Sequence, residues 1–211
     1  MPRIAIAAPI VAIAVVAIVT VQLRSAPEVE PPPAPVYVAP EDRPSSQLDE
    51  AGLDEVAASN AFVLNLVGAV PAAADLGLPA DGAVEVVRDG SAVRTILVTP
   101  DGEITRGPMR SIVVTTAGGA IVSVAAMRES FGFGAFTVIR SELAAGVEDF
   151  GWVFGDAEED ALLSTVADAV RADAPTRFEI VPGAAAGIAV GATVDCVSGG
   201  QCYLQYVMTP V

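Results

Sequence analysis

The sequence has no lysine and no histidine among its 211 residues, so each of its basic side chains is one of eleven arginines. Without histidine, Ser-His-Asp catalysis, Cys-His catalysis and any histidine-bearing metal site are excluded. Without lysine, Schiff-base chemistry and a Walker phosphate loop are excluded too. Carboxylate chemistry is what remains, and no stretch carries a specific catalytic or cofactor signature. We therefore expect no cofactor and no bound metal, and favour a protein that is not an enzyme.

Cysteine is scarce, and the two that are present lie close together near the end of the chain. Cys196 and Cys202 are separated by five residues (CVSGGQC). A redox pair prefers a C-x-x-C spacing, and a metal site would need two further ligands that the chain lacks. The spacing instead predicts a disulfide that closes a hairpin, provided that this part of the chain lies outside the cytoplasm.

Basic residues are far fewer than acidic ones. The net charge is -15, and the part after Arg24 carries nine arginines against 26 acidic residues, a balance of -17. Nucleic acid is excluded as a partner, because phosphate binding needs a basic face. Anionic lipid headgroups are disfavoured for the same reason. Such a surface suits solubility in a salty compartment, a basic partner protein, or divalent cations held loosely.

Charge is absent altogether from Ile4 to Leu23, which Arg3 and Arg24 bracket. As a helix these twenty residues would be roughly 30 Å long, the thickness of the hydrocarbon layer of a bilayer. We expect residues 1–24 to form a transmembrane anchor, with residues 4–23 in the lipid. A cleaved signal peptide is the alternative, but the exit Ser25-Ala26-Pro27 is poor for cleavage. A short N-terminal tail before a long domain favours an N-terminus in the cytoplasm and the bulk outside it.

Residues 25–46 hold seven prolines in 22 positions, which predicts an extended linker of up to ~70 Å. A passive tether is favoured over a docking segment around Pro31 to Pro35. Residues 47–211 are then left as one acidic domain, with room for a core.

Turn and capping signals divide this domain into short elements. Gln47 to Ser59 has helical periodicity, and Ser141 with Glu142-Leu143 suggests the start of a short helix. A further helix follows Asp156, which can cap it, with Leu162 and Val166 in its apolar stripe. Pro100-Asp101-Gly102 predicts a turn, and Ala117-Gly118-Gly119 predicts a hairpin. Strands are expected over Phe62–Val67, Val84–Val87, Val93–Thr99, Met109–Thr116, Ala120–Ala125, Phe136–Ile139, Thr176–Val181, Gly187–Val194 and Tyr203–Met208.

Val84–Val87 and Val93–Thr99 are expected to pair around a turn near Asp89-Gly90. In the predicted order of elements, most strands follow one another directly as hairpins, and few are separated by a helix. The sequence therefore predicts an α+β fold with a mainly antiparallel sheet and two or three helices.

Aromatic residues make up 5% of the chain, and a few of them are grouped. Phe131 and Phe133 alternate with glycines, and Trp152 and Phe154 follow Gly151. We take Phe131, Phe133, Trp152 and Phe154 as candidate interface residues. The alternative is that the glycines loosen a turn leading into a core strand, and that Trp152 is a core residue.

Acidic residues cluster beside these aromatics. Glu148, Asp149 and Glu158, with Trp152, could serve a carboxylate-dependent hydrolase or a module that binds a small ligand. The alternative is electrostatic, because acids in the first turn of a helix are favoured by the helix dipole.

The order of a single N-terminal span, a proline-rich stalk and a small β domain (LNLVGAV, VEVVRDG, VRTILVTPDGEI and SIVVTT within Leu64 to Val124) resembles the inner-membrane scaffold subunits of bacterial secretion and pilus machines. The resemblance carries over no residue, and the last eighty residues do not follow it. It implies a single-pass protein of the bacterial inner membrane, whose periplasmic domain scaffolds a complex with other membrane or envelope proteins.

Overall fold

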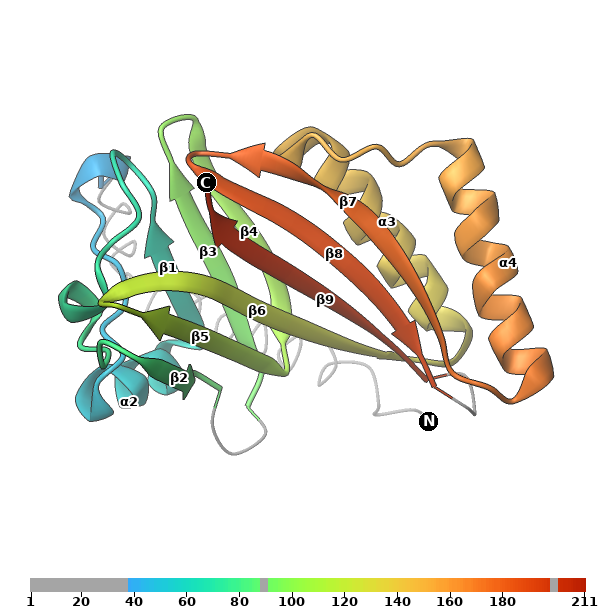
Figure 1. The fold of residues 1–211 in the computed structure, drawn as a ribbon, viewed down its shortest axis with the longest axis horizontal. Coiled ribbons are helices and arrows are strands. Elements are labelled where there is room, and N and C mark those ends of the chain that lie inside the picture. Colours follow the sequence, from blue (N-terminus) through green and yellow to red (C-terminus); the bar gives the residue numbers. More distant parts are fainter. Residues whose placement is uncertain (1–37, 88–90, 198–200) are drawn as a thin grey trace, which may run out of the picture. The chain divides into compact units, whose positions relative to one another are not determined.

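The structure is a computed structural model that describes residues 38–87, 91–197 and 201–211. Val38–Val211 form one compact unit of mixed α+β class, with mostly antiparallel sheets and, in the described part, three α-helices (Figure 1). The helices are α2 (Glu50–Ser59), α3 (Gly132–Phe150) and α4 (Asp156–Ala172), with 3-10 turns η1 (Pro40–Asp42) and η2 (Ala73–Leu76). The strands are β1 (Ala61–Asn65), β2 (Gly82–Glu85), β3 (Val93–Thr99), β4 (Gly102–Met109), β5 (Ser111–Ala117), β6 (Ala120–Phe131), β7 (Thr176–Ala185), β8 (Ile188–Cys196) and β9 (Gln201–Pro210).

The small sheet has the order β1-β3-β4. β3 and β4 form an antiparallel hairpin in which Thr99 pairs with Gly102, so the predicted turn at Pro100-Asp101-Gly102 is confirmed. Gly102 has φ +136°, which a residue with a side chain rarely adopts. β1 lies parallel to β3, with Phe62 opposite Thr95.

The expected pairing of Val84–Val87 with Val93–Thr99 is wrong. β2 pairs with β5, whereas β3 pairs with β1 and β4. The chain passes from one sheet to the other between β2 and β3, and Val86 N donates to the carbonyl of Ile112 instead. Residues 88–90, which include the expected turn at Asp89-Gly90, lie outside the described residues.

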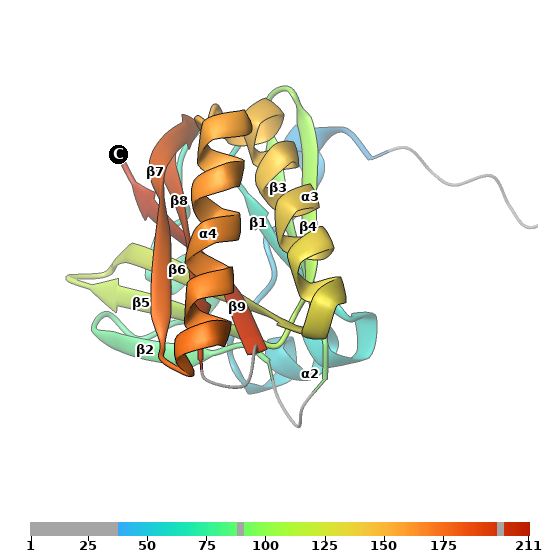
Figure 2. The same cartoon turned by 90° about the vertical axis from the view of Figure 1, so that its right-hand side faces the viewer.

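The large sheet has the order β2-β5-β6-β9-β8-β7 and is antiparallel throughout. Its strands alternate: in β9 every second residue from Cys202 to Met208 is buried, and the residues between them are half-buried. The helices α3 and α4 and the small sheet all lie on one side of the large sheet (Figures 1 and 2). The core therefore fills one face of the large sheet.

Helix α3 replaces the strand predicted at Phe136–Ile139 and includes the helix start predicted at Ser141 to Leu143. Its buried residues Ile139, Leu143 and Phe150 recur at helical spacing, which outweighs the short β-prone string. Gly146 fits the same buried stripe because a β-carbon there would lie 2.0 Å from the ring of Trp152. Glycine at this position lets the Trp152 ring lie directly on the helix.

The helices predicted within Gln47–Ser59 and after Asp156 are confirmed, with one correction to a cap. Asp49 caps α2 by accepting a hydrogen bond from Gly52 N at 2.8 Å. Helix α4 is capped at Gly155 and not at Asp156, because the Glu158 carboxylate accepts from Gly155 N at 2.9 Å and Asp156 is the first helical residue. Leu162 is fully buried, as its stripe predicts.

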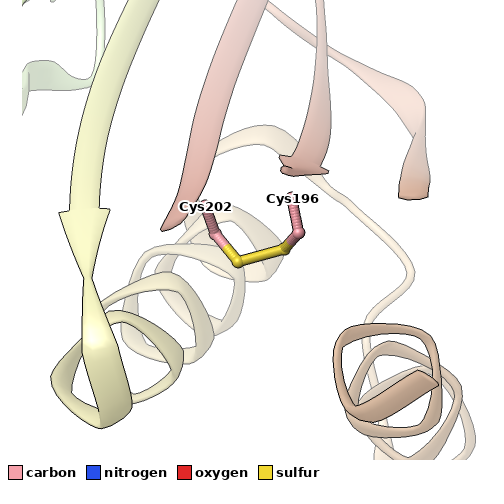
Figure 3. The surroundings of a disulfide bond; sticks show 2 residues. All are labelled: Cys196 and Cys202. Atoms are coloured by element: carbon pink, nitrogen blue, oxygen red, sulfur yellow. A yellow bond between two sulfur atoms is a disulfide. The ribbon is translucent and has the colours of Figure 1, made fainter. Parts of the chain in front are cut away.

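The predicted disulfide between Cys196 and Cys202 is present. The two residues are paired in the register of β8 and β9, with their α-carbons 4.0 Å apart, and Figure 3 shows the bond joining the ends of these strands. Both side chains are buried on the core face of the large sheet. The bond therefore fixes the end of the β8–β9 hairpin inside the core.

The start of the compact unit includes the last residues of the predicted linker. Ser45 and Ser46 accept hydrogen bonds from Asn65 N and Val63 N, at 2.8 and 2.9 Å, and so run along β1. In the described part of the chain, no helix is both long enough and apolar enough to cross a bilayer. The predicted anchor, residues 1–24, lies outside the described residues.

Candidate functional site: an acid-lined cleft beside a buried ion-pair network

A cleft of about 390 Å³ lies where two strand turns meet the end of a helix. One wall is the β3–β4 turn, the second is the last turn of α3, and the third is the β7–β8 turn. Every charged residue in its lining is acidic. The lining residues are Thr99, Asp101, Gly102, Glu103, Ile104, Glu148, Asp149, Ala184, Ala185 and Ala186.

Two glycines set the geometry of these walls. Gly151 has φ +69° and follows the last residue of α3, so the helix stops at Phe150. A β-carbon at Gly183 would lie 1.7 Å from the carbonyl oxygen of Phe150, so only glycine lets β7 approach the end of α3 this closely. The sequence Gly183 to Gly187 is thus explained by packing and by the tight turn at Ala186 and Gly187, both of which have positive φ.

Beside the cleft, two arginines and two carboxylates form a network that is mostly shielded from solvent. Arg106 of β4 pairs with Asp149 and lies 3.7 Å from Glu142, and Arg128 of β6 also pairs with Glu142. Tyr206 of β9 donates a hydrogen bond to Glu142 at 2.5 Å. The side chains of Arg106, Glu142 and Arg128 are 12%, 16% and 19% exposed.

This network balances its own charge and connects four elements. Arg106 and Arg128 offset Glu142 and Asp149, so α3 is joined to β4 of the small sheet and to β6 and β9 of the large one. The Arg106 guanidinium also lies 5.3 Å from the centre of the Phe150 ring. Charges that are paired in this way hold elements together, whereas a lone charge at the same depth would destabilise the fold.

Tyr206 is held in its protonated form. Burial is the largest cause of the raised pKa of its hydroxyl. The negative charge of Glu142 and the hydrogen bond to Glu142 raise this pKa further. The hydroxyl therefore acts as a fixed donor to Glu142.

The acidic residues of the cleft differ in their partners. Asp149 is paired with Arg106, and Glu103 is paired with Arg43. Asp101 and Glu148 form no ion pair with any of the residues that the structure describes. The cleft thus presents two uncompensated carboxylates, which suit a cationic group.

Of the four residues predicted as an interface, the structure describes the side chains of Trp152 and Phe154, and both pack against the core. Trp152 is 2% exposed, and its Nε1 donates a hydrogen bond to the carbonyl of Val190 at 2.7 Å. The centre of its ring lies 5.2 Å from the centre of the Phe150 ring and 5.9 Å from that of the Tyr206 ring. Phe154 is partly buried against the core. Phe131 ends β6 and Phe133 lies in the first turn of α3, but their side chains lie outside the described residues.

The predicted carboxylate group is also divided. Glu148 and Asp149 line the cleft, whereas Glu158 caps α4, and its neighbour Glu159 pairs with Arg140 of α3 at 2.7 Å. Trp152 lies in the core rather than beside a substrate-sized opening. The four residues of the hydrolase hypothesis therefore do not share one pocket.

The network residues Arg106, Arg128 and Glu142 were not predicted from the sequence. Arg106 could have been noticed, because it is two residues after Ile104 in the same strand. Alternate residues of a strand point to the same side, so Arg106 lies on the core-facing side of β4 with Ile104. A charge at a core position needs a buried partner, and the sequence cannot say which carboxylate supplies it. Within the described part of the chain, no three Asp, Glu or Cys residues are grouped so as to hold a metal ion.

Comparison with protein-family models, with curated proteins and with solved structures gives no match to this chain.

Proposed function

We infer that this chain is a non-enzymatic scaffold or assembly subunit of a bacterial envelope complex. In this proposal, residues 4–23 anchor it in the inner membrane, and its acidic domain meets partner proteins on the periplasmic side. The observation that carries the proposal is the order of segments: twenty uncharged residues, a proline-rich stretch, then one compact acidic unit from Val38 to Val211. Such an order suits a protein that works at a fixed distance from a membrane.

The buried disulfide supports the location. Disulfides persist in oxidising compartments such as the periplasm and are rare in the cytosol. Cys196 and Cys202 are paired and buried, which is typical of a structural bond rather than a reactive thiol pair.

The use of the ionisable residues supports a role that is not catalytic. Arg106, Arg128, Glu142 and Asp149 are engaged with one another between elements, so their charges stabilise packing. Glu158 is engaged in a helix cap. Of the three acids predicted for a hydrolase, Glu158 is therefore used in the cap of α4, and Asp149 is paired with Arg106.

Partner chemistry follows from the cleft. Asp101 and Glu148 offer negative charge that no ion pair to a described residue offsets, so we expect a partner to place an arginine or lysine side chain there. Such contacts act mainly on association rate and are weakened by salt.

The experiment is co-purification from membranes solubilised in mild detergent, at low and at high salt. We expect partner proteins at low salt, and we expect Asp101→Asn with Glu148→Gln to reduce their yield several-fold. The matched control is Glu50→Gln with Asp160→Asn, which removes the same charge at exposed positions away from the cleft. Recovery of the chain without any other protein at every salt and detergent condition would refute the scaffold role.

A further inference from the structure

The large sheet has a second face that no helix or strand of the described chain covers. This face points toward the viewer in Figure 1, and Figure 2 shows the helices and the small sheet on the opposite side. Along β9 and β5, the residues on this side are half-buried, while their neighbours on the core side are buried. We call this surface, made by alternate residues of β5, β6, β9 and β8, the open face.

The open face is uncharged at its centre. The strand register places Val113, Ala125, Val207 and Gly191 in one row across the four strands. The rows on either side consist of serine, threonine, alanine, glutamine and one methionine, Met127. Charged residues begin at the flanking strands, with Glu85 in β2 and Glu179 in β7, and at the end nearest the disulfide.

This neutrality contrasts with the rest of the unit. Residues 38–211 contain nine arginines against 24 acidic residues. An ordinary exposed surface is about a quarter or more charged, so twelve neighbouring positions without charge are unexpected. Uncharged strand faces with mixed small and branched side chains are typical of sheets that pack against another sheet.

We propose that the open face packs against the same face of a second copy of this chain. The distribution of charge on the chain favours a second copy over a basic partner protein. A basic partner would gain nothing from an uncharged surface and would bind the acidic surfaces instead. Two equally acidic copies can approach only where neither presents charge, and a twofold arrangement then directs the carboxylates of the rim away from the centre.

The area of the face fits such a dimer. The four strands of the open face, β5, β6, β8 and β9, contain 7, 12, 9 and 10 residues. At a spacing of ~4.8 Å and a rise of ~3.3 Å per residue they present roughly 600 Å². Two copies would then bury roughly 1,200 Å² in total, which is the lower end of the range for a specific, stable interface. The small side chain of Ala125 lies in one row with Val113 and Val207, so the side chains of two copies can interdigitate.

This inference concerns the folded unit and does not rest on the proposed membrane location or on partner proteins. The two proposals fail separately. Loss of self-association would leave partner co-purification unchanged, and absence of foreign partners would leave the mass of the dimer unchanged.

The test measures the mass of the full chain in detergent by size-exclusion chromatography with light scattering. We expect twice the protomer mass for the natural sequence and for Leu163→Glu, whose side chain is exposed on α4 away from the open face. We expect Val207→Glu to halve the mass, since it would oppose two carboxylates near the twofold axis. A monomeric natural chain, or a Val207→Glu variant that stays dimeric, would overturn the proposal.

A second pair of variants decides the matter if Val207→Glu does not fold. Ala125→Cys lies at the centre of the open face and should form an interchain disulfide under mild oxidation, while Thr137→Cys, exposed on α3, should not. Crosslinking of Thr137→Cys alone, or of neither variant, would contradict the proposed interface.

Discussion

Glu142 joins helix α3 to both sheets. It meets Arg128, Arg106 and Tyr206 at once, from three different strands, and its side chain is only 16% exposed. Arg128 depends on this carboxylate for charge balance, whereas Arg106 also pairs with Asp149 and the neutral Tyr206 donates a hydrogen bond to it. Removing the charge should therefore cost more than removing an exposed ion pair.

We predict that Glu142→Gln lowers the free energy of unfolding by about 3 kcal/mol, because it leaves Arg128 without its carboxylate partner. The control is Arg171→Gln, which breaks the exposed Arg171–Asp168 pair and should cost less than about 0.5 kcal/mol. Both are measured by chemical denaturation followed by circular dichroism. Equal, small losses in the two variants would mean that the network contributes little to stability.

At the scale of elements, the contact between α3 and the segment after it is set by Gly146. We predict that Gly146→Ala destabilises the fold by about 1–3 kcal/mol, since the new β-carbon would lie 2.0 Å from the Trp152 ring. The sign is the informative part, because Gly→Ala inside a helix ordinarily stabilises by about 0.5–1 kcal/mol. Thermal unfolding with Trp fluorescence measures the change, and a raised melting temperature would show that Trp152 does not pack on the helix.

Elements whose signals are local could be predicted from the sequence. The turn at Pro100 to Gly102, the hairpin at Gly118-Gly119, the helix within Gln47 to Ser59 and the disulfide all depend on neighbours within a few residues, and all are confirmed. Helix α3 was predicted to start only at Ser141 and its first turns were assigned to a strand, because Gly132 and Gly134 lower helix propensity there.

Features that join distant segments could not be predicted in this way. The parallel pairing of β1 with β3 needs a crossover that no turn signal marks, and β4 was not among the expected strands. The cleft combines the β3–β4 turn, the end of α3 and the β7–β8 turn, which are far apart in sequence. The sequence identified Glu148 and Asp149 as neighbours but gave no sign that Asp101 and Glu103 would face them.

At the scale of the whole molecule, location and covalent state are linked. The bond between Cys196 and Cys202 closes a short loop at the end of β8 and β9, and both residues belong to the core. If the domain lies in the periplasm, as proposed, the bond forms in the cell; a cytosolic domain would keep both thiols reduced.

We therefore predict that alkylation of denatured protein from freshly lysed cells modifies neither cysteine unless a reductant is added first. Replacing both Cys196 and Cys202 by serine should lower the free energy of unfolding by about 2 kcal/mol, because a closed loop of this length restricts the unfolded chain by that amount. Serine at only one of the two positions is the control for side-chain polarity, since it breaks the same bond and frees one thiol for alkylation. Complete alkylation without reductant would place the domain in a reducing compartment, and the periplasmic location would then have to be abandoned even if the full chain is recovered with membranes.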